Sequence, residues 1–394
     1  MKLSDLIRRE KNNADALRLV AAAAVIWGHA YALAPEPGRV DPIQTLLTFD
    51  YSGSLAVKFF FFLSGLLVTN SLVERPSAVA FACARFFRII PALVVCAAIV
   101  TLLAGPFFTT VSLPEYIRKT QFVHIIFVHP FLDYQLVGVF KDHAFPQMNG
   151  SIWTIQYEIF LYTFLLAIGL LGLLRSKLIG SIICLVAIAL ALIDPSIISY
   201  IGLGAGSSGR YFPAFFAGGA LLAIHKETIE ISYKFVIGLV LLAASVRLGT
   251  AFELFFLVAF LIGTLALSST SLIKAIKLPG DYSYGVYVYG WPVQQCVREI
   301  WPNIGIHGNQ ALTITLAGLL AIFSWHCVER PSLNFGKRLA LWLPAAVMRP
   351  WRASGQTMFV FRRSGGSSDL ALCAITNRVD YSVSTKGLPG SNQV

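Results

Sequence analysis

The sequence predicts an all-α, polytopic integral membrane protein: a helical bundle of about ten transmembrane helices with both termini in the cytoplasm. Three observations lead to this prediction. Of the 394 residues, 56% are hydrophobic and only 13% are charged, whereas a soluble domain carries about 25% charged residues. Apolar segments of helical length recur along the chain between polar loops. Lysine and arginine are also distributed unevenly between alternate loops, which orients a membrane protein.

Three regions follow one another along the chain. Residues 1–14 are a polar cytoplasmic segment, residues 15–340 form the transmembrane domain, and residues 341–394 are a polar tail that we expect to be disordered. The apolar patch His124–Leu132 is too short to span a bilayer and is expected to be re-entrant or interfacial. The predicted spans are Asp15–Leu33, Gly53–Leu72, Ala92–Phe108, Ser151–Leu174, Leu178–Ile193, Tyr211–Ile224, Phe235–Leu248, Phe252–Leu267, Tyr284–Ile300 and Leu312–Val328.

The loops between these spans set the orientation. With the N-terminus inside, the inner segments up to the last span hold 13 lysines and arginines and the outer segments hold 7. Cytoplasmic loops carry the excess of positive charge, so this bias supports an even number of spans. The expected location is the bacterial inner membrane, crossed several times.

Within the first span, the stretch Ala16–Leu33 carries two side chains that can hold a charge, Arg18 and His29. They are eleven residues apart, which at about 100° per residue is about 20° beyond three turns. Both therefore leave the same helix face, about 16 Å apart along the axis. A charge inside a membrane helix is expensive, and such groups usually point into the protein and serve its function. The alternative is that each side chain reaches its nearer membrane surface without further role.

One motif lies in the second predicted span and another directly precedes the third. In FFFFLSGLLV, the small residues Ser64 and Gly65 are expected to allow close helix packing. In ARFFRIIP, Arg85 and Arg88 are three residues apart and so share a helix face. On the cytoplasmic side they could hold phosphates or simply anchor the helix; their spacing alone does not separate these interpretations.

Glu158 lies about two turns into the fourth predicted span, among apolar residues. A buried glutamate needs a cationic partner or a raised pKa. Counting from the outer helix ends gives similar depths for Glu158 and His29, about 10 and 7 Å. We therefore expect Glu158 to orient His29 or to stabilise its charged form. The alternative is an ion pair with another cation, such as Lys58.

The last two spans contain further polar groups. The tyrosines of GDYSYGVYVYGWPVQQ (residues 280–295) begin at a cytoplasmic helix end and are expected to be interface aromatics. Glu329 stands beside Arg330 in SWHCVERP (residues 324–331), where the last span is expected to end. A salt bridge at the helix end is the expected role of Glu329.

Composition also limits the partners. The net charge of +11 would suggest nucleic acid for a soluble protein, but these cations sit at helix ends, so no nucleic acid is expected. The 6 cysteines show no metal-ligand or CxxC spacing, which predicts neither a metal site nor a disulfide framework. No short apolar segment precedes a small-residue cleavage site, so the first span is expected to be retained.

Taken in order, these stretches resemble the acyltransferase 3 family of membrane O-acyltransferases, which modify bacterial surface and secreted carbohydrates. The resemblance covers about residues 15–331. One departure is Gly290, where many relatives have a histidine before the aromatic residue. The motifs are an Arg-x10-His pair (Arg18, His29), FFLSG (Phe61–Gly65), Arg-x-x-Arg (Arg85, Arg88), W-T-x-x-x-E (Trp153–Glu158), S-Y-G-x-Y (Ser283–Tyr287) and V-E-R-P (Val328–Pro331).

The resemblance implies a donor and an acceptor on opposite sides of the membrane. The donor would be a cytoplasmic acyl-CoA, most often acetyl-CoA, with Arg85, Arg88 and Arg18 near its phosphates. The acceptor would be a hydroxyl of a carbohydrate or glycolipid. His29 would act as general base or assist outward passage of the acyl group, with Glu158 beside it. The acyl group would cross between the two levels on the pantetheine arm of CoA or through an acyl-enzyme.

Two other functions compete with this one. A transporter or flippase of glycan or glycolipid units would also have many spans and intramembrane charges, but no inverted repeat or broken helix favours it. The other is a sensor or assembly protein with an inactive enzyme core. The presence of all five charged or titratable motif residues speaks against that interpretation; they are Arg18, His29, Arg85, Arg88 and Glu158.

Overall fold

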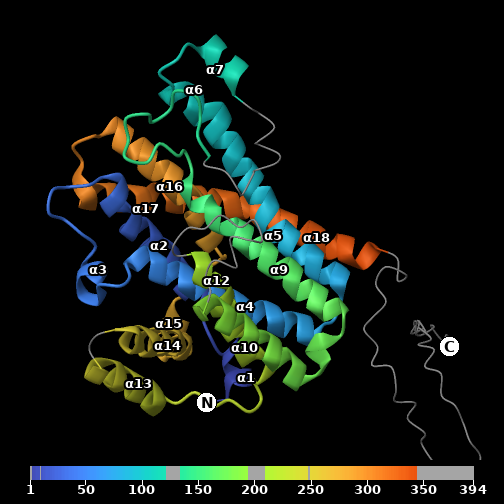
Figure 1. Cartoon of the computed structure of the whole chain (residues 1–394). Helices are drawn as coiled ribbons and strands as arrows, with labels where there is room; N and C mark the ends of the chain where they lie inside the picture. The colour runs from blue at the N-terminus through green and yellow to red at the C-terminus, as the bar shows by residue number, and fades with distance from the viewer. Residues whose placement is uncertain (1, 9, 121–133, 194–208, 247–248, 344–394) are drawn as a thin grey trace, which may run out of the picture. The chain divides into compact units, whose positions relative to one another are not determined.

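The computed structural model describes residues 2–8, 10–120, 134–193, 209–246 and 249–343 (Figure 1). Within these ranges the secondary structure is helical, and the only strand-like pairing is an isolated antiparallel bridge between Lys2 and Glu230. The predicted patch His124–Leu132 lies outside the described residues, as does the predicted tail 341–394 except for its first three residues.

Every predicted span overlaps a helix or a run of consecutive helices. In chain order these are α2 (Ala14–Leu33), α4 (Ser52–Glu74), α5–η1–α6 (Ala78–Phe108), η2–α9 (Gly150–Leu170), α10 (Lys177–Ile193), α12 (Phe212–Ile224), α13 (Tyr233–Val246), α14 (Thr250–Leu267), α16 (Ser283–Ile300) and α17–η5–α18 (Gly305–Trp342). Short helices in the connections include α1 (Leu3–Leu6), α3 (Pro42–Leu47), α7 (Leu113–Lys119) and α15 (Ser271–Ala275).

Six of these segments are long and apolar enough to cross a bilayer, which makes the chain a multi-pass membrane protein. They are α2, α4, α5–η1–α6, η2–α9, α14 and α17–η5–α18. Helices α10, α12 and α13 are apolar but shorter, and α16 carries several polar side chains. The count of ten crossings and the cytoplasmic position of both termini therefore stay predictions.

Helix α2 lies inside the bundle, packed against α4, α16 and α17 (Figure 1). It begins where the side chain of Asn13 accepts a hydrogen bond from the backbone N–H of Ala16, a common N-cap arrangement. Ala22 and Val25 are buried in this packing. The predicted stripe of Arg18 and His29 is therefore carried on a helix with neighbours on several sides.

The predicted close packing at Gly65 is confirmed. A Cβ atom at Gly65 of α4 would lie 1.9 Å from the carbonyl oxygen of Phe216 in α12. On the other helix, a Cβ atom at Gly219 would lie 2.0 Å from the carbonyl oxygen of Phe62. Small residues let membrane helices approach until their backbones touch, so α4 and α12 form a tightly joined pair.

Helix α5 begins earlier than predicted. It starts at Ala78, where the hydroxyl of Ser77 accepts the N–H of Ala80, and Pro91 lies inside it. Proline removes one backbone N–H from the helix, and contacts with neighbouring helices make that loss tolerable in a membrane. Arg85 and Arg88, which precede the predicted third span Ala92–Phe108, therefore lie within helix α5.

The last span also continues further than predicted. Helix α17 passes through a π-helical turn, η5 (Trp325–Glu329), directly into α18 (Arg330–Trp342). Pro331 occupies the first turn of α18, where a missing N–H is least harmful, and the wider π turn accommodates it. Glu329 is therefore not at the end of the last helix.

Candidate active site

Ionic groups from four elements meet at the N-terminal end of α16. Asp281 Oδ2 accepts a hydrogen bond from Arg88 Nη2 at 2.7 Å and lies 3.6 Å from Arg18 Nη1. Arg88 Nη1 is 3.4 Å from Glu329 Oε2, and Arg18 Nη1 is 3.4 Å from Asp15 Oδ1. Arg18 on α2 and Arg88 on α5, although distant in sequence, thus share one carboxylate.

Asp281 has two structural roles in this arginine cluster, in which Arg18 and Arg88 meet the carboxylates of Asp15, Asp281 and Glu329. Its Oδ1 accepts hydrogen bonds from the N–H and the hydroxyl of Ser283, at 3.3 and 2.6 Å, at the start of α16. Burial raises the pKa of Asp281, but the positive charges of Arg88 and then Arg18 outweigh it and lower that pKa from 3.8 to about 2. Asp281 is therefore ionised, and it fixes the two arginines relative to α16.

A second group of polar side chains surrounds Tyr162 on α9. The Tyr162 hydroxyl donates to Glu158 Oε1 at 2.5 Å and lies 3.3 Å from Ser64 Oγ. The guanidinium carbon of Arg85 lies 5.6 Å from the centroid of the Tyr162 ring, within cation–π range. Arg85 thus stacks on the ring whose hydroxyl binds Glu158.

The expected contact between Glu158 and His29 is wrong. The hydrogen-bond partner of Glu158 is Tyr162, and no hydrogen bond or ion pair joins Glu158 to His29 among the described residues. Of the alternative, an ion pair with another cation, the example of Lys58 is wrong, because Lys58 forms an ion pair with Asp50 and donates to Ser54 Oγ at 3.1 Å. Glu158 is instead connected to Arg85 through Tyr162, which contacts both residues.

His29 has an aromatic neighbour on α16. Its ring lies 4.9 Å from the Trp291 ring, edge to face at 76°. The indole Nε1 of Trp291 donates to the carbonyl of Gln147 at 2.9 Å, and a Cβ atom at Gly150 would lie 2.5 Å from that indole. Gln147 and Gly150 therefore contact the indole of Trp291, and the same indole packs against one side of the His29 ring.

Two tyrosines that lie on α16 between Asp281 and Trp291 in sequence bind neighbouring elements through their hydroxyl groups. The Tyr287 hydroxyl lies 2.5 Å from Thr154 Oγ1 and 2.8 Å from the Ser151 carbonyl. The Tyr284 hydroxyl donates to the Ile89 carbonyl at 2.9 Å. The expectation of interface tyrosines is wrong for both, because they face neighbouring helices. Helix α2 thus carries Arg18 in the arginine cluster and, about 16 Å further along its axis, the imidazole of His29.

Residues 11–328 match the profile of the acyltransferase 3 family, described as an acyltransferase domain. The chain belongs to the acyltransferase 3 family. It is similar to an O-acetyl transferase of Shigella phage Sf6, with 30% identity over 348 residues, covering 82% of this chain and 97% of that protein. A local match of 93 residues, 40% identical, relates it to nodulation protein 10 of Rhizobium leguminosarum bv. viciae; it covers 23% of this chain and 24% of that protein. No solved structure matches the chain significantly.

The departure from the family motif at Gly290 has a structural counterpart in this acyltransferase. A Cβ atom at Gly290 would lie 2.8 Å from Cγ1 of Ile26. The glycine therefore lets α16 approach α2 at Ile26, in the turn that leads to His29. A larger side chain here would require the two helices to move apart or Ile26 to change rotamer.

Sequence reasoning missed two residues of this acyltransferase's site. Asp281 lies within the quoted segment 280–295, and its signal was an acidic residue two positions before a serine at a helix start. Trp291 lies in the same segment, but nothing in the sequence indicates that it would contact His29. The salt bridge expected for Glu329 at a helix end is wrong. Glu329 forms an ion pair with Arg88 of another helix.

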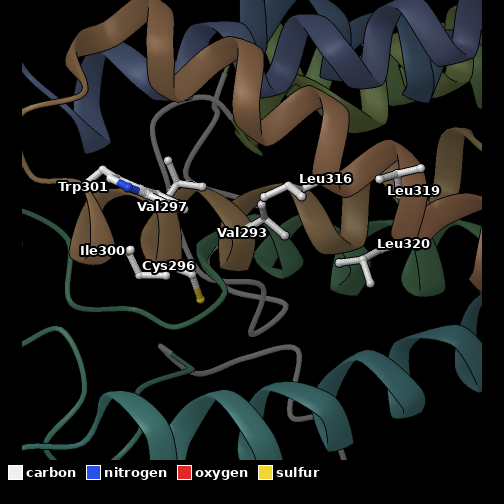
Figure 2. A pocket seen from close by; sticks show the side chains of 8 residues that line it. All are labelled: Val293, Cys296, Val297, Ile300, Trp301, Leu316, Leu319 and Leu320. Carbon is white, nitrogen blue, oxygen red and sulfur yellow. The ribbon is translucent and has the colours of Figure 1, made fainter.

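A cavity of about 340 Å³ lies between α16 and α17, apart from these groups (Figure 2). The side chains that line it are aliphatic or aromatic except for Cys296, and neither His29 nor any arginine is among them. None of the described residues that line it is an acid–base or phosphate-binding group for acyl transfer. The lining residues are Val293, Cys296, Val297, Ile300, Trp301, Leu316, Leu319 and Leu320.

Proposed function

We propose that this acyltransferase moves an acetyl group from acetyl-CoA to a hydroxyl of a carbohydrate or glycolipid, in the inner membrane of a bacterium. The proposal is supported by the arrangement of α2, which has Arg18 in the arginine cluster and His29 three turns further along the helix. The similarity to an O-acetyl transferase of a Shigella phage supports acetyl as the group that is transferred.

Arg18, Arg85 and Arg88 would bind the donor. CoA carries several phosphates, and guanidinium groups bind phosphate through paired hydrogen bonds. Arg85 is the best placed, because its described contact is with the Tyr162 ring and not with a carboxylate. Arg88 and Arg18 are already held by Asp281, so a phosphate would share them with that carboxylate.

His29 would serve as the general base. The acceptor hydroxyl attacks the thioester carbonyl carbon, its proton passes to His29, and the carbon–sulfur bond breaks to release CoA. A hydroxyl has a pKa far above 7, so the base must take the proton as the new carbon–oxygen bond forms. Trp291 would limit the orientations of the imidazole through their edge-to-face contact.

Glu158 takes a different place in this proposal from the one expected. Through Tyr162 it would hold the aromatic ring on which Arg85 stacks, so its role would be on the donor side. With both termini in the cytoplasm and ten crossings, Arg18, Arg85 and Arg88 would face the cytoplasm, and His29 would lie in the outer half of the membrane. This is the arrangement that a cytoplasmic CoA donor and an external acceptor require.

Replacement of His29 tests the proposal. Surface carbohydrate from cells with the parent chain should carry the added mass of an acetyl group, and carbohydrate from His29→Ala cells should not. His326→Ala is the matched control, since His326 is exposed in η5. Undiminished acetylation in His29→Ala cells would refute the proposed base. Acceptor that accumulates inside the cell without any change in mass would instead support a transporter.

A further inference from the structure

The turn of α2 that leads to His29 receives hydrogen bonds from two other helices. Gln294 Nε2 on α16 donates to the carbonyl of Ile26 at 2.9 Å, and Gln310 Nε2 on α17 donates to the carbonyl of Trp27 at 3.1 Å. These carbonyls belong to consecutive residues of the turn that ends at His29. Helices α2, α16 and α17 pack against one another (Figure 1), so the two amides reach one turn of α2 from two sides.

The amides are part of a buried network. Asn309 accepts a hydrogen bond from Gln294 Nε2 at 3.1 Å and donates to the Gln294 carbonyl at 3.2 Å. Gln310 Oε1 lies 2.9 Å from Nδ1 of His307, which is itself exposed. Gln294 and Asn309 are 0% exposed and Gln310 is 1% exposed. Water therefore does not reach these amides, and Gln294 Nε2 is satisfied by the Ile26 carbonyl and Asn309, whereas Gln294 Oε1 has no hydrogen-bond partner among the described residues.

Packing alone does not explain these side chains. Burying an amide costs free energy unless it is hydrogen-bonded, and an apolar residue of similar volume fills the same space without that requirement. Both α2 carbonyls are also within a regular helix, which already gives them a partner. What the amides add is direction, since a donated hydrogen bond fixes the rotation and height of the α2 turn.

The same stretch of α16 also contacts the His29 ring. Trp291, which lies edge to face with His29, precedes Gln294 by three residues, about one helical turn. Gly290 permits the close approach of α16 to Ile26. One face of α16 thus holds the α2 backbone through Gln294 and the imidazole through Trp291. The backbone that carries His29 and the surface against which its ring rests are joined.

We infer that Gln294 and Gln310 are positioning residues for His29, which clamp its helical turn at Ile26 and Trp27. The inference rests on the proposed role of His29 as general base. Displacement of a catalytic group by about 1 Å can reduce turnover about a hundredfold. Release of one clamp should therefore slow transfer without weakening donor binding, because Arg18 lies about three turns away along α2.

Gln310→Met tests the clamp most cleanly. Methionine keeps the volume and removes the donor, the Trp27 carbonyl keeps its helical partner, and the exposed His307 can turn to water. Thr313→Val is the matched control on the same helix: Thr313 is 0% exposed, and its hydroxyl has no hydrogen-bond partner among the residues that the structure describes. Both variants would be purified as full-length chains in lipid nanodiscs and assayed for acetyl transfer to the host glycan across acetyl-CoA concentrations.

We expect the kcat of Gln310→Met to fall by about ten- to a hundredfold, with the KM for acetyl-CoA within twofold of the parent value and with Thr313→Val unchanged. Gln294→Met, which releases Ile26, should show the same division between kcat and KM, and it serves as the test if Gln310→Met does not accumulate. Parental kcat in the folded variants would overturn the inference. So would equal losses in kcat and acetyl-CoA affinity, because they indicate a general disturbance of the bundle.

The inference and the proposed function fail in different ways. If His29→Ala abolishes transfer while Gln310→Met and Gln294→Met transfer at the parental rate, the base stands and the clamp is refuted. If His29→Ala transfers normally, the proposed role of His29 fails, and the clamp with it. A loss of kcat in the clamp variants that persists unchanged in the His29→Ala background would also refute the clamp, because it must act through His29.

Discussion

Removal of the Asp281 charge should destabilise the protein through the two arginines that share it. Asp281→Asn keeps an oxygen that can accept from Ser283 but removes the partner of Arg88 at 2.7 Å and of Arg18 at 3.6 Å. The ionised Asp281 contributes about 2 kcal/mol, which corresponds to the lowering of its pKa from 3.8 to about 2. Arg88 would remain paired with Glu329, so we expect a loss near this value and not a collapse of the fold.

Thermal unfolding in detergent measures the effect. If the 394 residues unfold in one step, a loss of 2 kcal/mol lowers Tm by about 2–3 °C. Because the folded-state pKa of Asp281 is lowered, its contribution is complete above pH 3.8 and is lost as the pH falls through about 2. The difference in Tm between parent and Asp281→Asn should therefore shrink below about pH 4 and vanish near pH 2.

An exposed acidic residue provides the control for this experiment. Asp5 lies 3.9 Å from Arg8, and their side chains are 47% and 65% exposed. Exposed pairs of this kind contribute little, so Asp5→Asn should leave Tm unchanged. An Asp281→Asn variant with the parental Tm at pH 7 would refute the reasoning, because it would mean that Asp281 gains nothing from the two arginines.

Two more predictions concern α4 and the donor arginines. Gly65→Ala should abolish folded protein in detergent extracts, because its Cβ would lie 1.9 Å from the Phe216 carbonyl, whereas Gly218→Ala, with no atom within 4 Å, should be extracted normally. Equal yields would contradict the close contact of α4 and α12. Arg85→Ala should raise the Kd for acetyl-CoA about tenfold, the value of one charged hydrogen bond, while the exposed Arg75→Ala should not. Unchanged binding by Arg85→Ala would remove it from the donor site.

Composition and helical periodicity are sufficient to predict the helical membrane class and the stripe on α2. Apolar composition leaves few alternatives to membrane helices for the chain, and the stripe depends only on helical periodicity within one element. The predicted start of the third span and the predicted end of the last span were wrong, since Pro91 lies inside α5 and Pro331 in the first turn of α18. In a packed bundle, contacts with other helices can outweigh the local cost of a proline.

The contacts between polar side chains of different helices become known from the tertiary structure alone. Glu158 was placed beside His29 by counting residues from a helix end that was assumed to lie at the outer surface. In the structure that end is inside the bundle, because Asn149 donates to the Val288 carbonyl in the middle of α16. Glu158 therefore does not lie at the level of His29, and its neighbours are Tyr162 and, through the Tyr162 ring, Arg85.

The same limit applies to Asp281 and to the clamp at Ile26 and Trp27. Their partners are separated by 193 residues for Arg88 and by 268 and 283 residues for the two clamp bonds. Periodicity describes one helix at a time and contains no information on the rotation of one helix against another. That rotation follows from side-chain packing across α2, α16 and α17, and it determines which groups surround His29.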